Sequence, residues 1–422
     1  MQRSPEHSLK EIALLKQIAQ KRMQEIKTAR ANQSKKLDVF GAAESSDFRT
    51  FSKSEALRWL GITHTNTFDR AFKGIKAKYP EREFVRESNK NYAFTLSDLH
   101  FFADEMGVPA FKRTEFQKCI TIAIGALKGG VGKTTSTVNI AAGLALSNKR
   151  LRIAVIDMDP QGTATLIGLP NFSHEYYSVG DILTGNYSLE EGETDEQFVR
   201  DCFQTTSIPN LKYLPGTVTD AFFENHLESL LLNNTIKKPE DAYKYLKEKI
   251  INAVQDDFDI ILIDTPPAVG KIAYNTFYAS DAFVIPMMPE MFSFAATMRY
   301  MERFEEMYSN LLKAGHDGFY FIRFLITNLV IDNNSKKQQV GSNYRSMMRS
   351  YFGNRVIPTP MYNSKAIGVC IDFFSTVYGL KNGEYSGTKS HLVDAQRNMD
   401  DIVREIEALC FNIWEPNEFE GL

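Results

Sequence analysis

The sequence has few cysteines and no long apolar run, and these absences exclude several classes of protein. Four cysteines occur in 422 residues, at Cys119, Cys202, Cys370 and Cys410. No pair has the close spacing of a zinc finger, and no disulfide framework is visible, so we expect a reducing cytoplasm. Apolar runs such as Phe283 to Met288 are far shorter than the roughly 20 residues of a membrane span. The polar start Met1-Gln-Arg-Ser-Pro is unlike a signal peptide, so neither secretion nor a membrane partner is expected.

The net charge of −3 is small, but it is unevenly distributed. Residues 1–113 contain 21 Lys and Arg against 14 Asp and Glu, a formal charge of +7, so the remainder carries −10. A basic arm on an acidic body is typical of nucleic-acid contact, although solvated lysine-rich helices give the same excess. The length predicts two or three folding units.

A long amphipathic helix is predicted at the N-terminus. Between Ser8 and about Arg30, apolar residues recur at steps of three or four, at Leu9, Ile12, Leu15, Ala19, Met23 and Ile26. Such a narrow stripe favours pairing with a second copy, and packing on its own domain is the alternative. Residues 1–45 are therefore predicted to form a dimerisation helix and a linker.

Residues 46–110 predict a winged helix-turn-helix domain. Ser52 and Glu55 form a capping box before a helix through Leu60, Gly61 supplies a turn, and Thr63 or Thr65 caps a helix through Ile75. Two strands, 83–86 and 92–95, are expected to form a hairpin before a helix from 97 to 106. The second helix of such a module enters the DNA major groove and would present His64, Thr65, Asn66, Arg70 and Lys73. A small protein-docking domain is the alternative.

Residues 111–422 predict an α/β domain. Apolar strands alternate with helical segments at 120–126, 153–156, 260–263, 283–286 and 321–327. The stretch 171–257 has few strand signals, and its lysine-rich helix 239–254 is interpreted as an insertion or a covering helix. The expected fold class is a mostly parallel sheet of the P-loop NTPase type, flanked by helices and preceded by the N-terminal helix and winged domain.

A glycine-rich loop follows the first of these strands. It comprises Lys128, Gly129, Gly130, Val131, Gly132, Lys133, Thr134 and Thr135, and it leads into an Ala-rich helix. Glycines let backbone N–H groups surround phosphate oxygens, and the helix N-terminus adds a positive end. Lys133 would then reach the β- and γ-phosphates, and the Thr134 hydroxyl would bind Mg²⁺.

The start of the loop departs from the usual pattern. Gly is expected five residues before Gly132, but Leu127 stands there, and a second lysine, Lys128, follows it. A lysine at this point reaches the nucleotide of a facing subunit more easily than its own, and there it would neutralise charge during phosphoryl transfer. The alternative is a solvated surface lysine.

Two acidic motifs end other predicted strands. Asp157 and Asp159 lie in Ile-Asp-Met-Asp-Pro-Gln-Gly, and Asp264 lies in Ile-Leu-Ile-Asp-Thr-Pro-Pro. Open α/β sheets place ligands at the carboxyl ends of their strands. Asp264 is predicted to support Mg²⁺ through water, and Asp157 and Asp159 are predicted to divide metal support from water positioning, although each aspartate alone also fits a helix cap.

Together the three motifs resemble the ParA family of DNA-partition ATPases, over about Thr121 to the C-terminus. The N-terminal helix and winged module resemble the larger class-Ia members, in which that module binds the operator of the partition operon. The resemblance implies an ATP/ADP and Mg²⁺ site shared by a homodimer. In it Lys128 acts across the dimer, and Asp159 is the hydrolytic aspartate. Asp157 and Asp264 support the metal, Thr135 contacts phosphate and Asn328 lies near adenine.

The resemblance further implies DNA partition as the function. The ATP-bound dimer would bind non-specific DNA through C-terminal basic residues, here Arg345, Arg349, Arg355 and Lys365. A ParB-type centromere-binding adaptor would stimulate a weak hydrolysis that releases the DNA, and the protein would be cytoplasmic and nucleoid-associated. The alternative function is a nucleotide-sensing transcriptional repressor. A MinD-like membrane ATPase would need a basic amphipathic tail, and an iron–sulfur carrier would need converging cysteines; the sequence has neither.

Overall fold

The computed structural model describes Thr28 and residues 48–86, 91–126, 128–169, 176–267, 270–330, 336–380 and 385–415, without the side chains of 336–340. The predicted N-terminal dimerisation helix lies outside the described residues apart from Thr28. Residues 47–422 belong to one compact unit, distinct from residues 1–46. The domain boundary near residue 110 stays a prediction.

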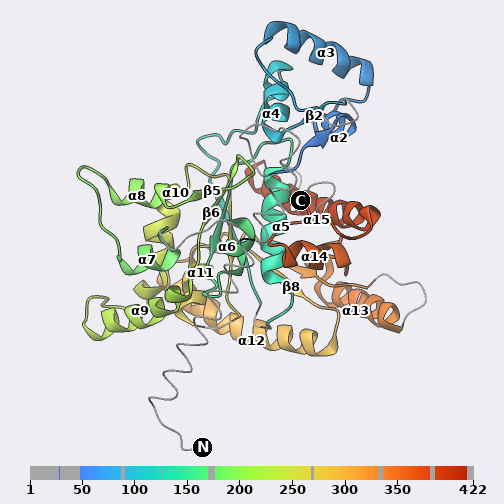
Figure 1. The fold of residues 1–422 in the computed structure, drawn as a ribbon. Helices are drawn as coiled ribbons and strands as arrows, with labels where there is room; N and C mark the ends of the chain where they lie inside the picture. Colours follow the sequence, from blue (N-terminus) through green and yellow to red (C-terminus); the bar gives the residue numbers. More distant parts are fainter. Residues whose placement is uncertain are drawn as a thin grey trace, which may run out of the picture. The chain divides into compact units, whose positions relative to one another are not determined.

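A mostly parallel sheet forms the centre of this unit (Figure 1). Its strands in the described residues are β3 Ile120–Ile124, β4 Ile153–Asp157, β5 Gln204–Thr205, β6 Leu211–Leu214, β7 Ile260–Asp264, β8 Ala282–Met287 and β9 Phe321–Ile326. Their order is β5-β6-β4-β7-β3-β8-β9, and only the short edge strand β5 runs antiparallel. The predicted α/β fold class is therefore confirmed.

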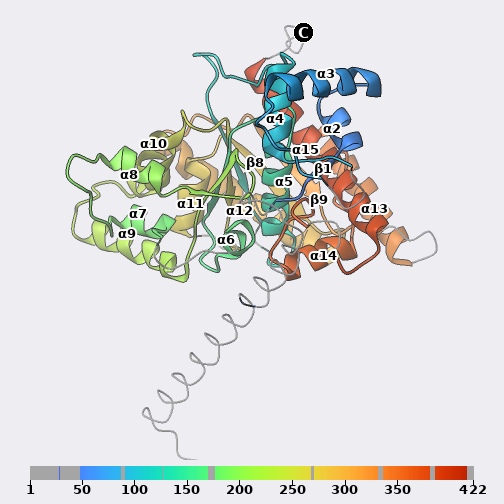
Figure 2. The same ribbon diagram turned by 45° about the horizontal axis from the view of Figure 1, so that its top comes forward.

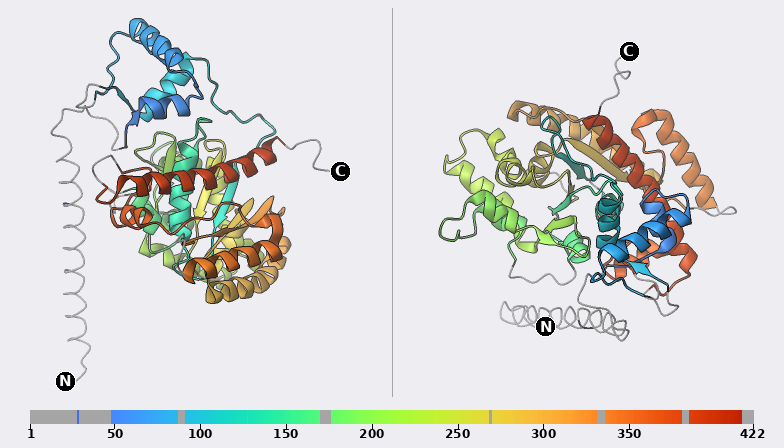
Figure 3. Two further views of the ribbon diagram at one scale, coloured as in Figure 1. Left: turned by 90° about the vertical axis from the view of Figure 1, so that its right-hand side faces the viewer. Right: turned by 90° about the horizontal axis from the view of Figure 1, so that it is seen from above.

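Helices cover both faces of the sheet, because its strands are buried on both sides. Ile120, Ile122 and Ile124 of β3 pack in a core with α5 Lys133–Ala145, α14 Lys365–Asp372 and α15 Lys389–Trp414. The opposite face is covered by α7 Val179–Thr184, α8 Asp195–Asp201, α9 Phe222–Leu232, α10 Asn252–Val254, α11 Lys271–Tyr278 and α12 Met291–Ala314. Figure 2 shows these two groups on opposite sides of the strands, and Figure 3 shows the length of α15. Two further helices of this α/β region are α6 Thr163–Gly168 and α13 Lys336–Phe352.

The segment 171–257 contains more sheet than its sequence indicates. Strands β5 and β6 lie within it, and β6 pairs in parallel with β4. The predicted helix 239–254 is irregular, with a 3₁₀ turn at Pro239–Tyr243, a π turn at Lys247–Ile251 and the short helix α10. Its buried residues pack on the sheet, so of the two interpretations the covering helix applies.

The N-terminal module follows its predicted helices closely. It contains β1 Phe51–Ser52, α2 Lys53–Trp59, α3 Thr65–Lys78, β2 Ala93–Phe94 and α4 Leu96–Glu105. Ser52 and Glu55 form the expected capping box at the start of α2. At α3 the expected threonine cap is wrong: His64 is the N-cap residue, and its side chain makes no capping bond.

The expected hairpin is also only partly correct. Strand β2 pairs with β1 in an antiparallel ladder, whereas the segment 83–86 contributes one bridge, from Arg86 to Tyr92. The reason is tertiary packing: Phe51 and Phe94 are register partners and both are buried in the core. The pairing of β1 with β2 places these two aromatic rings on the same face of the ladder, where both are buried.

The C-terminal end of α5 contacts this module. The Trp59 indole N–H donates to the Leu146 carbonyl at 2.8 Å, and Arg150 forms an ion pair with Asp104 at 2.6 Å. His100 lies between them, with its ring 5.6 Å from that of Trp59 and with Nε2 buried and unpartnered. Burial, with a smaller contribution from the Arg150 charge, lowers the pKa of His100 to about 4.

His100 is therefore expected to make the stability of the chain sensitive to acid. Its folded pKa lies below its unfolded value, so its stabilising contribution is present at neutral pH and is lost as pH falls through about 4. Urea unfolding between pH 7 and pH 4 should show a weaker pH dependence for His100→Phe than for the wild type. The exposed His391, changed in the same way, is the control. Equal acid sensitivity in all three proteins would contradict the assignment.

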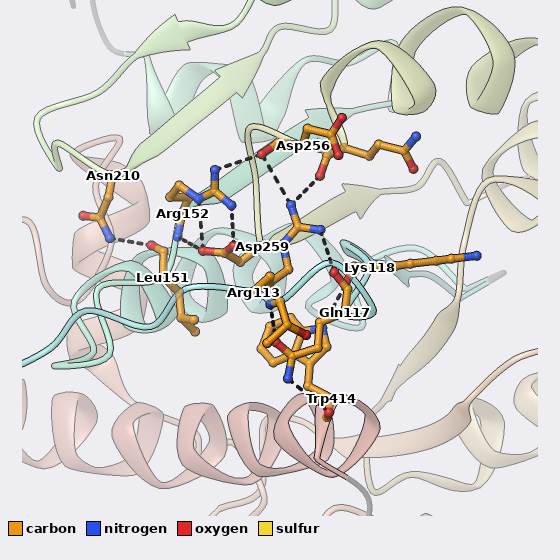
Figure 4. Close-up of polar contacts among 11 residues, drawn as sticks. Arg113, Gln117, Lys118, Leu151, Arg152, Asn210, Asp256, Asp259 and Trp414 are labelled. Atoms are coloured by element: carbon orange, nitrogen blue, oxygen red, sulfur yellow. Dashed lines mark hydrogen bonds and ion pairs between the residues drawn. The ribbon is translucent and has the colours of Figure 1, made fainter.

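An ion-pair network around the buried Asp259 connects residues that precede two strands of the sheet (Figure 4). Asp259 accepts hydrogen bonds from Arg113 Nε at 3.1 Å and Arg152 Nη2 at 2.7 Å. Nearby, the Trp414 indole donates to the Lys118 carbonyl at 2.8 Å. Arg152 and Asp259 precede β4 and β7, so the network lies at the amino ends of these strands. It therefore stabilises the sheet away from the carboxyl-end motifs.

Candidate functional site

The glycine-rich loop connects β3 to α5. Gly130 and Gly132 have φ angles of +73° and +84°, which side-chain-bearing residues rarely adopt. Gly132 is also the N-cap of α5, and no side chain caps its free N–H groups. The Thr327 hydroxyl donates to the Val131 carbonyl at 2.8 Å and holds the loop against the end of β9. An uncapped helix N-terminus beneath a glycine loop is suited to a phosphate group.

Lys133 is only 7% exposed, and its Nζ donates to the Lys128 carbonyl at 3.4 Å. Burial lowers the pKa of Lys133, and the carboxylates of Asp264 and Asp159 oppose that shift. An anionic ligand would also favour the charged lysine. The loop therefore holds a desolvated cation beside its free backbone donors.

Asp264 lies at the end of β7, where two hydroxyl groups of α5 hold it. Thr134 Oγ1 donates to Asp264 Oδ2 at 2.7 Å, and Thr137 Oγ1 donates to Oδ1 at 2.9 Å. Thr134 and Asp264 are thus brought together as the sequence predicts. A hydroxyl and a carboxylate are the hard oxygen groups that Mg²⁺ prefers.

Asp157 and Asp264 are register partners on adjacent strands, and both are fully buried. Burial raises the pKa of each carboxyl above its usual range, and the neighbouring aspartates raise it further. Asp157 is hydrogen-bonded within the protein: Oδ2 accepts from Thr165 Oγ1 at 2.8 Å and Oδ1 from Asp159 N at 3.2 Å. A nearby cation would offset the cost of two buried carboxylates.

Asp159 follows in the turn after β4 and is 9% exposed. Its Oδ1 accepts a hydrogen bond from Gln161 N at 3.0 Å. Strands β4, β7 and β3 are neighbours in the sheet. Asp159, Asp264 and the glycine loop therefore meet at the carboxyl ends of these three strands. This convergence is what open parallel sheets use to bind ligands.

Lys128 is directed to a partner within its own chain. Its Nζ lies 3.5 Å from Glu290 Oε2, at the start of α12, and the two side chains are 33% and 53% exposed. Such an exposed pair is worth at most about 1 kcal/mol, so Lys128 is easily released. The ion pair leaves the predicted role across a dimer untested.

Asn328 follows Thr327 in the segment after β9. It has a φ of +57°, and its Oδ1 accepts a hydrogen bond from Asn363 Nδ2. Thr135 lies in the first turn of α5, where its carbonyl accepts from Asn139 Nδ2 at 2.8 Å. The proposed adenine and phosphate contacts of these residues stay predictions.

The predicted DNA-contacting residues of the module lie on α3. Thr65, Asn66, Arg70 and Lys73 are all exposed. Asn66, Arg70 and Lys73 are spaced by four and three residues, so they share one helix face, opposite the buried Phe68 and Ile75. This face presents two cations and an amide to solvent.

Of the predicted C-terminal basic residues, Arg345 and Arg349 lie together, whereas Arg355 and Lys365 lie apart from them. Arg345 Nη2 and Arg349 Nη2, both on α13, each donate to the Pro358 carbonyl at 2.9 Å. Two guanidinium groups therefore converge on one neutral acceptor, an arrangement that favours an added anion. Arg355 and Lys365 are exposed elsewhere in this segment.

Several residues of this site were not predicted from the sequence. Thr137, Thr165, Thr327 and Glu290 all contact predicted site residues or their loop. Thr137 follows Lys133 by one helical turn, and that spacing was a usable signal. Thr327 and Glu290 are distant in the sequence, and nothing local indicates their contacts.

Other site classes find no support in the described residues. No three His, Cys, Asp or Glu side chains of the described ranges converge as a metal-binding group. The four cysteines are buried and unpaired. Among the helices of the part that the structure describes, none is both long and apolar enough to cross a bilayer.

Comparisons with known proteins agree with the site. The family model described as an AAA domain matches residues 119–314. Plasmid partition protein A of Escherichia coli is 24% identical over 324 residues, 76% of this chain and 78% of its own. The sporulation initiation inhibitor protein Soj of Bacillus subtilis is 35% identical over 173 residues, 41% of this chain and 59% of its own.

A solved structure titled Partition Protein has the same fold. It superposes with a TM-score of 0.66 at 19% identity and covers 96% of this chain and 99% of its own. Two of these relatives are named as partition proteins. This agrees with the site, which contains a phosphate loop with a second lysine and aspartates at the carboxyl ends of the strands. In sequence and in fold, the chain is similar to partition ATPases of the ParA type.

Proposed function

We propose that this protein is an ATP-dependent DNA-partition switch whose ATP-bound dimer holds DNA and whose hydrolysis releases it. One observation carries the proposal: Lys133, the Thr134–Asp264 pair and Asp159 converge at the carboxyl ends of adjacent strands. This set combines a phosphate-binding cation, a metal-supporting pair and a candidate base.

ATP and Mg²⁺ fit the residues present. The uncapped α5 N-terminus, the glycine loop and buried Lys133 would hold the phosphates, and Thr134 with Asp264 would support Mg²⁺. The family places Asp157 in metal support as well, and the adenine contact at Asn328. The cation would neutralise phosphate charge, which is the chemistry that Mg²⁺ supplies to ATPases. Mg²⁺ uses few protein ligands and several waters, so a cluster of three carboxylates is not needed.

Asp159 and Lys128 would carry hydrolysis. Asp159 would orient the attacking water and accept its proton, because it is a buried carboxylate that follows β4 at the same strand ends as the metal-supporting pair. Lys128 would leave Glu290 and neutralise the developing charge on the nucleotide of the facing subunit. Hydrolysis is therefore coupled to the dimer.

Two surfaces would contact DNA. The exposed face of α3 would read an operator in the major groove, and the Arg345–Arg349 pair, with Arg355 and Lys365, would bind phosphates without sequence preference. Relatives are named plasmid partition protein A and chromosome-partitioning ATPase. A ParB-type centromere-binding adaptor is the expected activator, and the nucleoid is the expected location.

Separate variants should distinguish the two DNA surfaces. Arg70→Ala/Lys73→Ala is expected to abolish operator-specific binding and to leave ATP-dependent non-specific binding intact. Arg345→Ala/Arg349→Ala should do the reverse, and should lower the salt slope of non-specific binding by about 1 per lost phosphate contact. Gel shifts with and without ATP measure both.

The control for charge is Lys237→Ala/Lys238→Ala, which removes two exposed cations elsewhere. If the α3 variant loses all DNA binding in every nucleotide state, the nucleotide-sensing repressor is the better description. If neither variant changes any binding, the proposed DNA surfaces are wrong.

A further inference from the structure

Thr165, on α6, connects two neighbouring segments at the carboxyl ends of the strands: the end of β4 and the turn after β6. Its Oγ1 donates to Asp157 Oδ2 at 2.8 Å, and its backbone N–H donates to the same oxygen at 2.8 Å. The same Oγ1 accepts from Gly216 N at 2.8 Å. Thr165 is 1% exposed, so water cannot replace these bonds. One hydroxyl therefore connects the last residue of β4 with the turn after β6.

The turn after β4, which contains Gly162, and the turn after β6, which contains Gly216, are packed too closely to move independently. A Cβ added to Gly216 would lie 2.4 Å from the Asp157 carbonyl oxygen. A Cβ added to Gly162 would lie 2.8 Å from the Gly216 carbonyl oxygen, and Gly162 also has a φ of +62°. Only glycines allow this approach. A displacement of the Gly216 turn would therefore reach Asp157 directly.

Asp159 is placed by this same arrangement. Its N–H donates to Asp157 Oδ1 at 3.2 Å, and its carbonyl accepts from Gly162 N at 2.8 Å. Thr165 holds the other oxygen of Asp157, so it determines how that carboxylate is turned. Both Asp157 oxygens are engaged with the protein.

We propose that Thr165 is a positioning residue, which acts through Asp157 and Gly216 to hold Asp159 where it can serve hydrolysis. The inference rests on the proposed hydrolytic role of Asp159. It gives Asp157 a scaffolding role in addition to any metal support. Removing the hydroxyl leaves Gly216 N–H without its buried acceptor, so the turn is expected to shift.

The test compares Thr165→Val with Thr165→Ser in the full-length protein. Valine keeps the shape and removes the hydroxyl, whereas serine keeps the hydroxyl. For valine we expect basal kcat for ATP hydrolysis to fall by about 100-fold, because small misplacements of catalytic groups cost that much. KM for ATP and ATP-driven dimerisation should stay near wild type. Serine should restore most of kcat.

Thr276→Val is the matched control. Thr276 is fully buried on α11, and its hydroxyl donates only to the Ile272 carbonyl, so its loss should not change kcat. Asp159→Ala, measured in parallel, separates two kinds of failure. Normal hydrolysis in Asp159→Ala overturns the proposed function. If Asp159→Ala is inactive, then wild-type kcat in Thr165→Val, or no rescue by serine, overturns the positioning role alone.

Discussion

Asp159→Ala is expected to lose ATP hydrolysis and to retain ATP-dependent dimers. The carboxylate is 9% exposed beside the Thr134–Asp264 pair, and its Oδ1 accepts a hydrogen bond from Gln161 N. A positioned base contributes about 10²- to 10⁴-fold, so kcat should fall within that range. ATP binding should persist, because Lys133 and the loop are untouched.

Two measurements on the same variant check this expectation. Phosphate release gives kcat, and sedimentation with ATP, ADP or no nucleotide gives the oligomeric state. Asp195→Ala, which removes an exposed acid at the start of α8, is the control for lost charge. Normal turnover in Asp159→Ala would rule out its assigned role. A variant that neither binds ATP nor dimerises would show instead that Asp159 is needed to form the site.

Lys128→Ala is expected to lower kcat by a larger factor, about 10³- to 10⁵-fold, the range for a charge supplied in trans to a transferring phosphoryl group. Within one chain Lys128 pairs with Glu290 at 3.5 Å. That exposed pair is weak, so its loss should leave the free energy of unfolding within about 1 kcal/mol of wild type. The effect of the substitution should therefore be kinetic.

A mixing experiment tests whether Lys128 acts on the facing subunit. In a heterodimer of Lys128→Ala and Asp159→Ala chains, one site has its own Asp159 and receives Lys128 from the partner. If Lys128 acts across the interface, mixing two inactive variants should restore a fraction of wild-type hydrolysis. If Lys128 acts on its own nucleotide, both sites stay defective and mixing restores nothing.

The mixture needs its own control. Lys128→Ala mixed with a chain carrying both Lys128→Ala and Asp159→Ala has no intact site under either arrangement. Activity in that mixture would reveal contamination or a bypass. Activity only in the first mixture is the result that assigns Lys128 to the neighbouring nucleotide.

Most of the α/β fold was predictable from local pattern. Strands β3, β4, β7, β8 and β9 were indicated by short apolar runs, because strands buried on both faces must be apolar throughout. Strand β6 was missed: its Leu-Lys-Tyr-Leu contains a lysine and is four residues long. Its pairing with β4 depends on contacts between residues about 60 positions apart in the sequence, which no local window contains.

The residues of the site also fall into two groups: those that the sequence predicts and those that only the tertiary structure brings together. Lys133, Thr134 and the loop glycines were identifiable because they follow one another in a single short motif, and Lys128 because it replaces an expected small residue. Thr165 looks like an ordinary helical threonine in sequence. It becomes a link only because β4 and β6 are neighbours and bring Gly216 beside it. The partner of Lys128, Glu290, is likewise supplied by the distant start of α12.

The sequence by itself determined the chemistry available: a phosphate loop, a second lysine and three aspartates that follow apolar strands. Those features are local, because backbone conformation and helix starts depend on near neighbours. Only the tertiary structure decided which groups meet. The strand order β6-β4-β7-β3 places Asp157 beside Asp264 and the turn of Gly216 beside Thr165. Strand order follows from burying both faces of the sheet at once, and that requirement belongs to the whole chain.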